Sequence, residues 1–207
     1  MPIPAAELAG ALEATARLRT LVDRTDDLGA PSLLPGWTRA HVVAHVVGNA
    51  RSHIRVLQAA HEEEVADQYP GGAAAREQEI AGLAADPALA VKELHHTAEE
   101  LAHEWRSTSD WAVLWQPLKG DAAPVERLVW ARWREVEVHA VDLNAGYRPE
   151  DWPAPFLSRL LEELRGRTDL PSLAGITGPD HALAAWLSGR SRGEGLQGEL
   201  PAIPPWR

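Results

Sequence analysis

The stretch Arg132-Trp-Arg-Glu-Val-Glu-Val-His-Ala-Val-Asp142 has the composition and apolar spacing of a single helix. Glu135 and His139 lie four residues apart, so a helix brings both side chains to the same face. A carboxylate and an imidazole on one helical face are two suitable ligands for a divalent metal ion. The stretch therefore predicts a helix that carries two ligands of a metal site.

The faces of this helix distinguish its two glutamates. At about 100° per residue, one apolar stripe consists of Leu128, Val129, Val136, Ala140 and Leu143. Glu135 and His139 lie at a margin of that stripe, with Asp142 beside them, whereas Glu137 falls on the opposite side, which we expect to be solvated. Glu135 is thus the better ligand candidate, because a metal ion would neutralise its charge if it faced inward.

The sequence around this stretch predicts helix after helix. Apolar periodicity and turn residues place helices near residues 5–23, 38–61, 73–84, 86–106 and 124–146, with loops at 26–37 and 107–121. Thr38 is a suitable N-cap, as is Asp86 before Pro87. Long helices with short connections favour an antiparallel four-helix bundle.

Beyond Tyr147 the pattern changes to shorter elements separated by glycine and proline. A helix is expected after Pro155, a short strand near 173–176 and another helix over about 180–188. We therefore expect a mainly α protein with a metal-binding bundle over 1–149 and a small C-terminal α/β domain over 150–207.

Composition limits the classes of function. The chain has 207 residues, a formal net charge of -10 and no cysteine. An acidic chain is a poor nucleic-acid ligand, and the lack of cysteine excludes disulfides, thiolate metal sites and a protein thiol nucleophile. The N-terminus lacks signal-peptide features, and no apolar run approaches the roughly 18 residues of a membrane span. A cytoplasmic protein that binds neither nucleic acid nor a membrane is expected.

The third metal ligand is sought in the helix over 38–61. His41, His45 and His53 share one row of that helix with Asn49, and spacing does not choose among them. Three nitrogen and oxygen ligands from two helices, with a fourth position left to water, are typical of a catalytic zinc site. The same ligand set would also bind Ni²⁺, Co²⁺ or Fe²⁺.

Three segments taken in order resemble one known family. They are Leu34-Pro-Gly-Trp-Thr-Arg-Ala-His-Val-Val-Ala-His-Val46, Tyr69-Pro-Gly-Gly-Ala-Ala-Ala-Arg76 and Arg134-Glu-Val-Glu-Val-His-Ala-Val-Asp-Leu143. The sequence is similar to the mycothiol-dependent maleylpyruvate isomerases of the DinB-like, metal-binding four-helix-bundle superfamily. The resemblance covers roughly residues 5–146, and the stretch 176–190 resembles a shortened form of the family's C-terminal domain.

The resemblance implies specific residues and partners. It places the zinc ligands at His45, Glu135 and His139, and an arginine needed for activity at Arg190, with Arg192 as the rival. It also implies Zn²⁺ as the metal, mycothiol as thiol cosubstrate, and cis–trans isomerisation of maleylpyruvate, a small anion.

Further residues are expected around the ligands. Arg76 and Asn49 are candidates for binding the anionic substrate, and Asp142, with Asn49 as a second candidate, is expected to orient a ligand imidazole.

Three other functions remain open from the sequence. One is a different thiol-dependent enzyme of the same superfamily, for example a transferase that conjugates mycothiol to electrophiles. The second is a noncatalytic helical protein that binds a metal or a small ligand, and the third is a purely structural protein with no metal.

Overall fold

The computed structural model describes residues 4–62, 64–117 and 120–206. Internal contacts divide the chain into two units, Met1–Ala145 and Gly146–Arg207. The helices of the first unit are α1 (Ala5–Asp23), α2 (Arg39–His61), α3 (Gly72–Ala84), α4 (Pro87–Ser107) and α5 (Arg127–Asp142).

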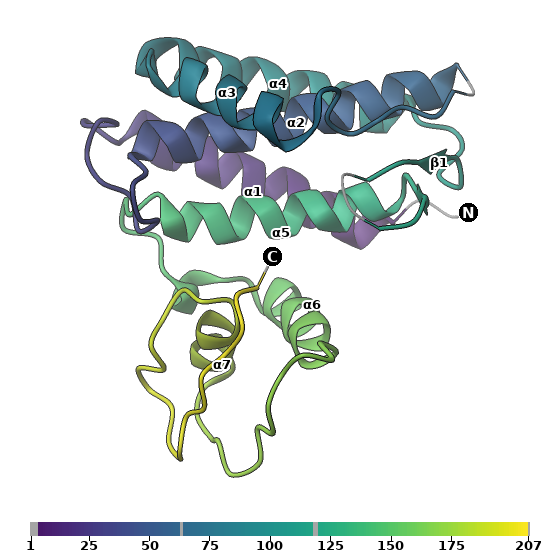
Figure 1. Ribbon diagram of the computed structural model, residues 1–207. Coiled ribbons are helices and arrows are strands. Elements are labelled where there is room, and N and C mark those ends of the chain that lie inside the picture. The colour runs from purple at the N-terminus through teal and green to yellow at the C-terminus, as the bar shows by residue number, and fades with distance from the viewer. Residues whose placement is uncertain (1–3, 63, 118–119, 207) are drawn as a thin grey trace. The chain divides into compact units, whose positions relative to one another are not determined.

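Four of these helices form the predicted bundle (Figure 1). Helix α1 packs on α5, α5 on α2, α2 on α4, and α4 on α1, which closes the bundle around one core. Helix α3 lies against α2 and α4 outside this ring. The bundle buries most of α2, including an unbroken run from Val42 to Ala50. This burial of apolar surface is the main stabilising contribution to the first unit.

Two helix starts follow the capping rules anticipated from the sequence. The Thr38 hydroxyl accepts a hydrogen bond from the backbone N–H of His41, at the first turn of α2. The Asp86 carboxylate accepts one from the N–H of Leu89 at 3.0 Å, and Pro87 occupies the first position of α4. These caps satisfy helix N–H groups that would otherwise lack partners, and so fix where both helices begin.

The expectation that Glu137 would be solvated is wrong. Its side chain is 1% exposed, and one carboxylate oxygen lies 2.6 Å from Nη2 of Arg17 on α1. The Nε1 atom of Trp133 also approaches that oxygen, at 3.4 Å. The physical reason is that α5 is flanked by both α1 and α2, so it buries two faces rather than the single stripe of a surface helix.

The segment expected as a loop over 107–121 contains a strand. Strand β1 (Leu114–Trp115) pairs antiparallel with β2 (Ala123–Pro124), and Trp111 and Trp115 are buried beside the bundle. Residues 118 and 119 lie outside the described part of the chain. A strand of two residues is too short to show a periodicity, because it is defined by its pairing with β2 rather than by a pattern of its own.

The second unit contains the short 3₁₀ helix η1 (Pro149–Asp151), α6 (Ala154–Arg165) and α7 (Asp180–Leu187). The strand expected near 173–176 does not form; over 146–206 the extended backbone pairs only at an isolated bridge between Thr177 and Gln197. Within the described ranges of the whole chain, no helix combines the length and apolar character that a bilayer span needs.

Candidate metal centre

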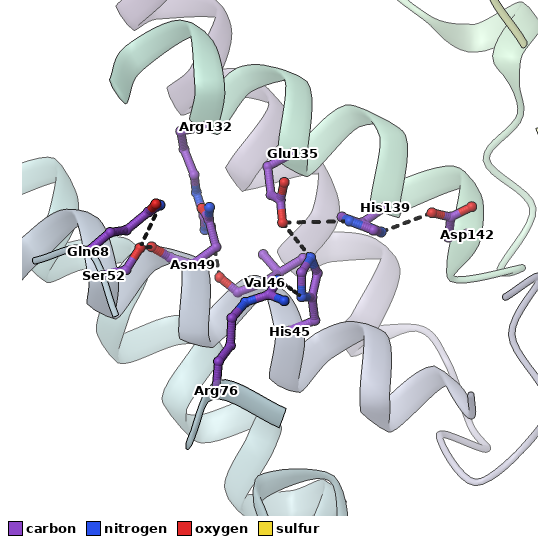
Figure 2. Close-up of polar contacts among 10 residues, drawn as sticks. All are labelled: His45, Val46, Asn49, Ser52, Gln68, Arg76, Arg132, Glu135, His139 and Asp142. Atoms are coloured by element: carbon purple, nitrogen blue, oxygen red, sulfur yellow. Dashed lines mark hydrogen bonds and ion pairs between the residues drawn. The ribbon is translucent and has the colours of Figure 1, made fainter. Parts of the chain in front are cut away.

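His45, Glu135 and His139 converge on one point, although they come from two helices far apart in the sequence (Figure 2). One ligand atom from each residue can be chosen so that all three lie within 4.8 Å of one another. Oε1 of Glu135 contacts Nε2 of His45 and lies 3.6 Å from Nε2 of His139. The two imidazole rings meet edge to face, with centroids 4.4 Å apart.

Helix packing produces this convergence. His45 lies in the buried run of α2 that faces α5, and the four-residue spacing on α5 directs Glu135 and His139 toward it. The indole of Trp37 adds an apolar wall, with its ring centroid 5.5 Å from that of His45. Side-chain exposures of 8% for His45, 20% for Glu135 and 12% for His139 place the cluster at the edge of the core.

The electrostatics of the cluster favour the protonation states that metal binding requires. Burial alone would raise the pKa of Glu135, but the neighbouring His45 and His139 hold the pKa of this carboxyl well below its usual value. Burial lowers the pKa of His45, and this outweighs the opposite effect of Glu135. The carboxylate is therefore ionised and the His45 ring neutral near pH 7, as ligands must be.

Asp142 supports one of the two imidazoles from behind. Its Oδ2 atom lies 2.9 Å from Nδ1 of His139, and its side chain is 1% exposed. A carboxylate this close to Nδ1 would favour a proton on that nitrogen and leave the lone pair of Nε2 toward Glu135 and His45, although the contact does not meet the geometry of a hydrogen bond. Helical spacing, three residues from His139, brings Asp142 to this place.

Arg76 of α3 approaches the other imidazole. Its Nη2 atom lies 2.8 Å from Nδ1 of His45, and its guanidinium carbon lies 5.2 Å from the centroid of the Tyr69 ring. A guanidinium only donates hydrogen bonds, so Nδ1 of His45 is the acceptor and carries no proton in this arrangement. A neutral imidazole that bound a metal through Nε2 would carry its proton on Nδ1, which Arg76 could not accept. Metal binding and this Arg76 contact are therefore in competition.

The rival histidines of α2 have other surroundings. Nδ1 of His41 lies 2.7 Å from Oγ1 of Thr38, as part of the helix cap. His53 is fully buried, and neither of its ring nitrogens has a hydrogen-bond partner among the described residues. Of the three histidines in this row, only His45 joins the cluster with Glu135 and His139.

Arg190 and Arg192 belong to the second unit. Arg190 lines a cavity of about 210 Å³ together with Arg148 and His181, and its guanidinium lies 5.8 Å from the centroid of the Trp206 ring. Nη1 of Arg190 also donates to the carbonyl of Ser188 at 2.7 Å. Arg192 is exposed and is not among the residues that line this cavity.

The match to a family model shows to which protein family the chain belongs. The model of the mycothiol maleylpyruvate isomerase N-terminal domain matches residues 8–144, which include all three residues of the cluster. The chain belongs to this family.

Solved structures extend the similarity beyond the family's N-terminal domain. The crystal structure of the mycothiol-dependent maleylpyruvate isomerase matches with a TM-score of 0.89 and 27% identity, covering 100% of this chain and 98% of the other. A crystal structure of a histidine-to-alanine mutant of that enzyme gives the same values. No curated protein matches this sequence.

The donor set of this family member fits a metal ion. Zinc bonds of about 2.0–2.1 Å in a tetrahedron bring ligand atoms to roughly 3.3 Å from one another. The 3.6 Å between Glu135 and His139, and the 4.8 Å limit on the whole set, are close enough for small side-chain rotations to close around one ion. Two imidazole nitrogens and one carboxylate oxygen leave a fourth position for another ligand.

One residue beside the centre is missed by the sequence reasoning. Arg132 of α5 is completely buried and donates from Nη1 to Oδ1 of Asn49 at 2.8 Å. Asn49 is thereby engaged by a protein side chain rather than directed only at a substrate. The available signal is the spacing, since Arg132 lies midway between Leu128 and Val136 on the apolar stripe itself.

Proposed function

We propose that this chain catalyses the mycothiol-dependent cis–trans isomerisation of maleylpyruvate to fumarylpyruvate, with Zn²⁺ held by His45, Glu135 and His139. The convergence of these three side chains, in a chain of this family, is the observation that carries the proposal. The similarity to the isomerase structure over the whole chain supports it.

The reaction explains why an external thiol is needed. Rotation about a carbon–carbon double bond is prohibitive until that bond becomes single. A thiolate that adds to the conjugated alkene forms a carbon–sulfur bond and moves the π electrons into an enolate. After rotation, the enolate expels the thiolate and restores the alkene in the trans form, so the thiol is regenerated. The protein has no cysteine, so the thiol must come from a cosubstrate.

The ligand residues prepare the centre for that thiol. Bound Zn²⁺ would favour the thiolate form of a thiol, whose free pKa is near 8.5. Glu135 contributes the one negative charge among the three ligands, which leaves the centre net positive toward an incoming sulfur. Asp142 fixes the His139 ring from behind, at 2.9 Å. The chain thus contributes placement and a suitable charge rather than a nucleophile of its own.

Arginines provide the charge that an anionic substrate requires. The net charge of -10 repels a dianion, so a local cationic group must offset it. We assign to Arg76, which lies beside His45, the binding of a substrate carboxylate. We assign to Asn49 a second contact with the substrate. We assign Arg190, in the cavity of the second unit, to stabilising the negative charge that develops during the reaction. We further assign the reaction to gentisate breakdown and the chain to the cytoplasm.

The experiment that tests this function measures maleylpyruvate isomerisation by the purified protein with and without mycothiol. We expect turnover only with the thiol and with stoichiometric zinc. The variants His45→Ala and His139→Ala should lose both bound zinc and activity while keeping their helix content. His103→Ala, which removes an exposed histidine from α4, is the matched control and should behave as wild type.

Three results would contradict the proposal or redirect it. Thiol-independent turnover would reject the cosubstrate, and normal turnover in either ligand variant would reject the centre. Consumption of mycothiol on other electrophiles without isomerisation would assign the chain to the transferases instead.

A further inference from the structure

Arg132 makes an unusual connection between two helices. Its side chain is 0% exposed, and Nη1 donates to the backbone carbonyl of Val46 at 2.7 Å and to Oδ1 of Asn49 at 2.8 Å (Figure 2). Its Nε and Nη2 atoms are buried and have no hydrogen-bond partner among the described residues. The guanidinium thus links α5 to α2 from inside the protein, out of reach of solvent.

The link lies next to the positions that carry the ligands. On α5, Arg132 precedes Glu135 by three residues, or just under one helical turn. On α2, its two acceptors are the residue directly after His45 and the residue one turn further on. The hydrogen bonds therefore join the two helices right beside the ligand cluster, rather than at a distant part of the bundle.

Stability does not account for an arginine at this place. Burying a guanidinium without a hydrogen-bonded carboxylate costs free energy, and apolar residues of similar volume commonly replace buried charges with no loss of stability. Burial lowers the pKa of Arg132 to about 10, with Glu135 acting in the opposite direction, so the side chain keeps its charge near pH 7. A charged group buried at such a cost is better explained by a role in fixing how α2 and α5 pack together than by a contribution to stability.

The metal centre requires that α2 and α5 are held precisely relative to each other. Sliding one helix past another by the rise of a single residue moves a side chain by about 1.5 Å. Metal–ligand distances tolerate only about 0.2 Å. A register shift of about 1.5 Å would break both hydrogen bonds of Arg132, whereas apolar packing alone specifies the register less strictly.

We propose that Arg132 is a positioning residue for the metal centre: its hydrogen bonds to Val46 and Asn49 set the register of α2 against α5, and so hold His45 where one ion meets Glu135 and His139. The inference rests on the proposed metal centre. It does not depend on the identity of the substrate or of the thiol.

The test is the variant Arg132→Met, which keeps most of the volume and removes both hydrogen bonds. Protein loaded with Co²⁺ reports coordination geometry through its visible absorption, and competition with a chelator gives the affinity for Co²⁺ and Zn²⁺. We expect Co²⁺ and Zn²⁺ to bind at least about tenfold more weakly, the usual loss when a group that supports a ligand is removed. The Co²⁺ spectrum should change, while Tm stays the same or rises.

Two further variants separate positioning from general stability. Asn49→Ala removes one acceptor and should shift affinity and spectrum in the same direction by a smaller factor, which keeps the proposal testable if Arg132→Met does not fold. Glu137→Gln is the matched control, because it weakens a different arginine contact of α5, the partly buried one with Arg17. This control should lower Tm and leave the Co²⁺ spectrum unchanged.

The outcomes are distinct. Unchanged Co²⁺ affinity and spectrum in Arg132→Met, or in Asn49→Ala if the first variant does not fold, would overturn the positioning role. A wild-type chain that binds no Co²⁺ or Zn²⁺ would overturn the metal centre and this role together. Metal binding without thiol-dependent isomerisation would leave the positioning role standing and reject only the proposed reaction.

Discussion

His53 should make the free energy of unfolding depend on pH in a way that one substitution removes. Its ring is completely buried in α2, and burial lowers its pKa to about 3, with the nearby Arg132 acting in the same direction. In the unfolded chain the same imidazole titrates near 6.5. Between these two pKa values the unfolded state binds a proton that the folded state does not, so stability falls as the pH is lowered through this window.

The size of the effect follows from the two pKa values. Lowering the pH from 7.5 to 4.5 should cost roughly 2.7 kcal/mol through His53 alone, since each pH unit in the window is worth about 1.4 kcal/mol. His53→Leu abolishes this contribution. At pH 7.5 the variant should be at least as stable as wild type, because it also removes two buried ring nitrogens that lack partners among the described residues.

The assay is urea unfolding followed by tryptophan fluorescence at several pH values, with a chelator present so that metal binding does not contribute. Because acidic residues titrate in both proteins, the quantity to compare is the difference between variant and wild type at each pH. His103→Leu, on the exposed face of α4, is the control and should show no growing difference, because that ring is hydrated in both states. Parallel stability curves for wild type and His53→Leu would refute the reasoning and show that His53 is protonated within the fold.

Three other substitutions test separate contacts. Asp142→Asn should weaken zinc binding by about 10–100-fold in a chelator competition, because the carboxylate that orients its imidazole is lost; unchanged affinity would reject that role. Arg76→Met should bind zinc more tightly while KM for maleylpyruvate rises, because the guanidinium no longer competes for His45; weaker zinc binding would show that Arg76 supports the centre instead. Gly10→Ala should lower Tm, at a cost of about 1–3 kcal/mol, because the added Cβ would lie 2.4 Å from Cζ2 of Trp133; an unchanged Tm would mean that α1 and α5 separate easily.

Much of the bundle could be predicted because its signals are local. Caps such as Thr38 and Asp86 mark helix starts, and apolar periodicity marks the helices themselves. The pairing of Glu135 with His139 follows from four-residue spacing alone. His45, by contrast, could not be separated from its neighbours by spacing, because the choice depends on how α2 is rotated against α5, and it was the family resemblance that indicated this residue.

The residues whose surroundings the sequence does not predict have one physical reason in common. A helical wheel assumes one buried stripe, and α5 buries two faces, so Glu137 was expected in solvent although it pairs with Arg17 inside. Arg132 does not stand out in the sequence, because arginine ordinarily lies at the surface and this one is buried. In each case, a contact with a distant helix overrides what the local pattern indicates.

X-ray absorption at the zinc edge, recorded on the purified protein before and after mycothiol is added, tests the central claim most directly. The chain has no cysteine, so sulfur near the metal must come from the added thiol. We expect nitrogen and oxygen neighbours alone at first, at about 2.0–2.1 Å, and one sulfur neighbour near 2.3 Å once mycothiol is present. Absence of sulfur after saturation with a thiol that supports turnover would contradict the account.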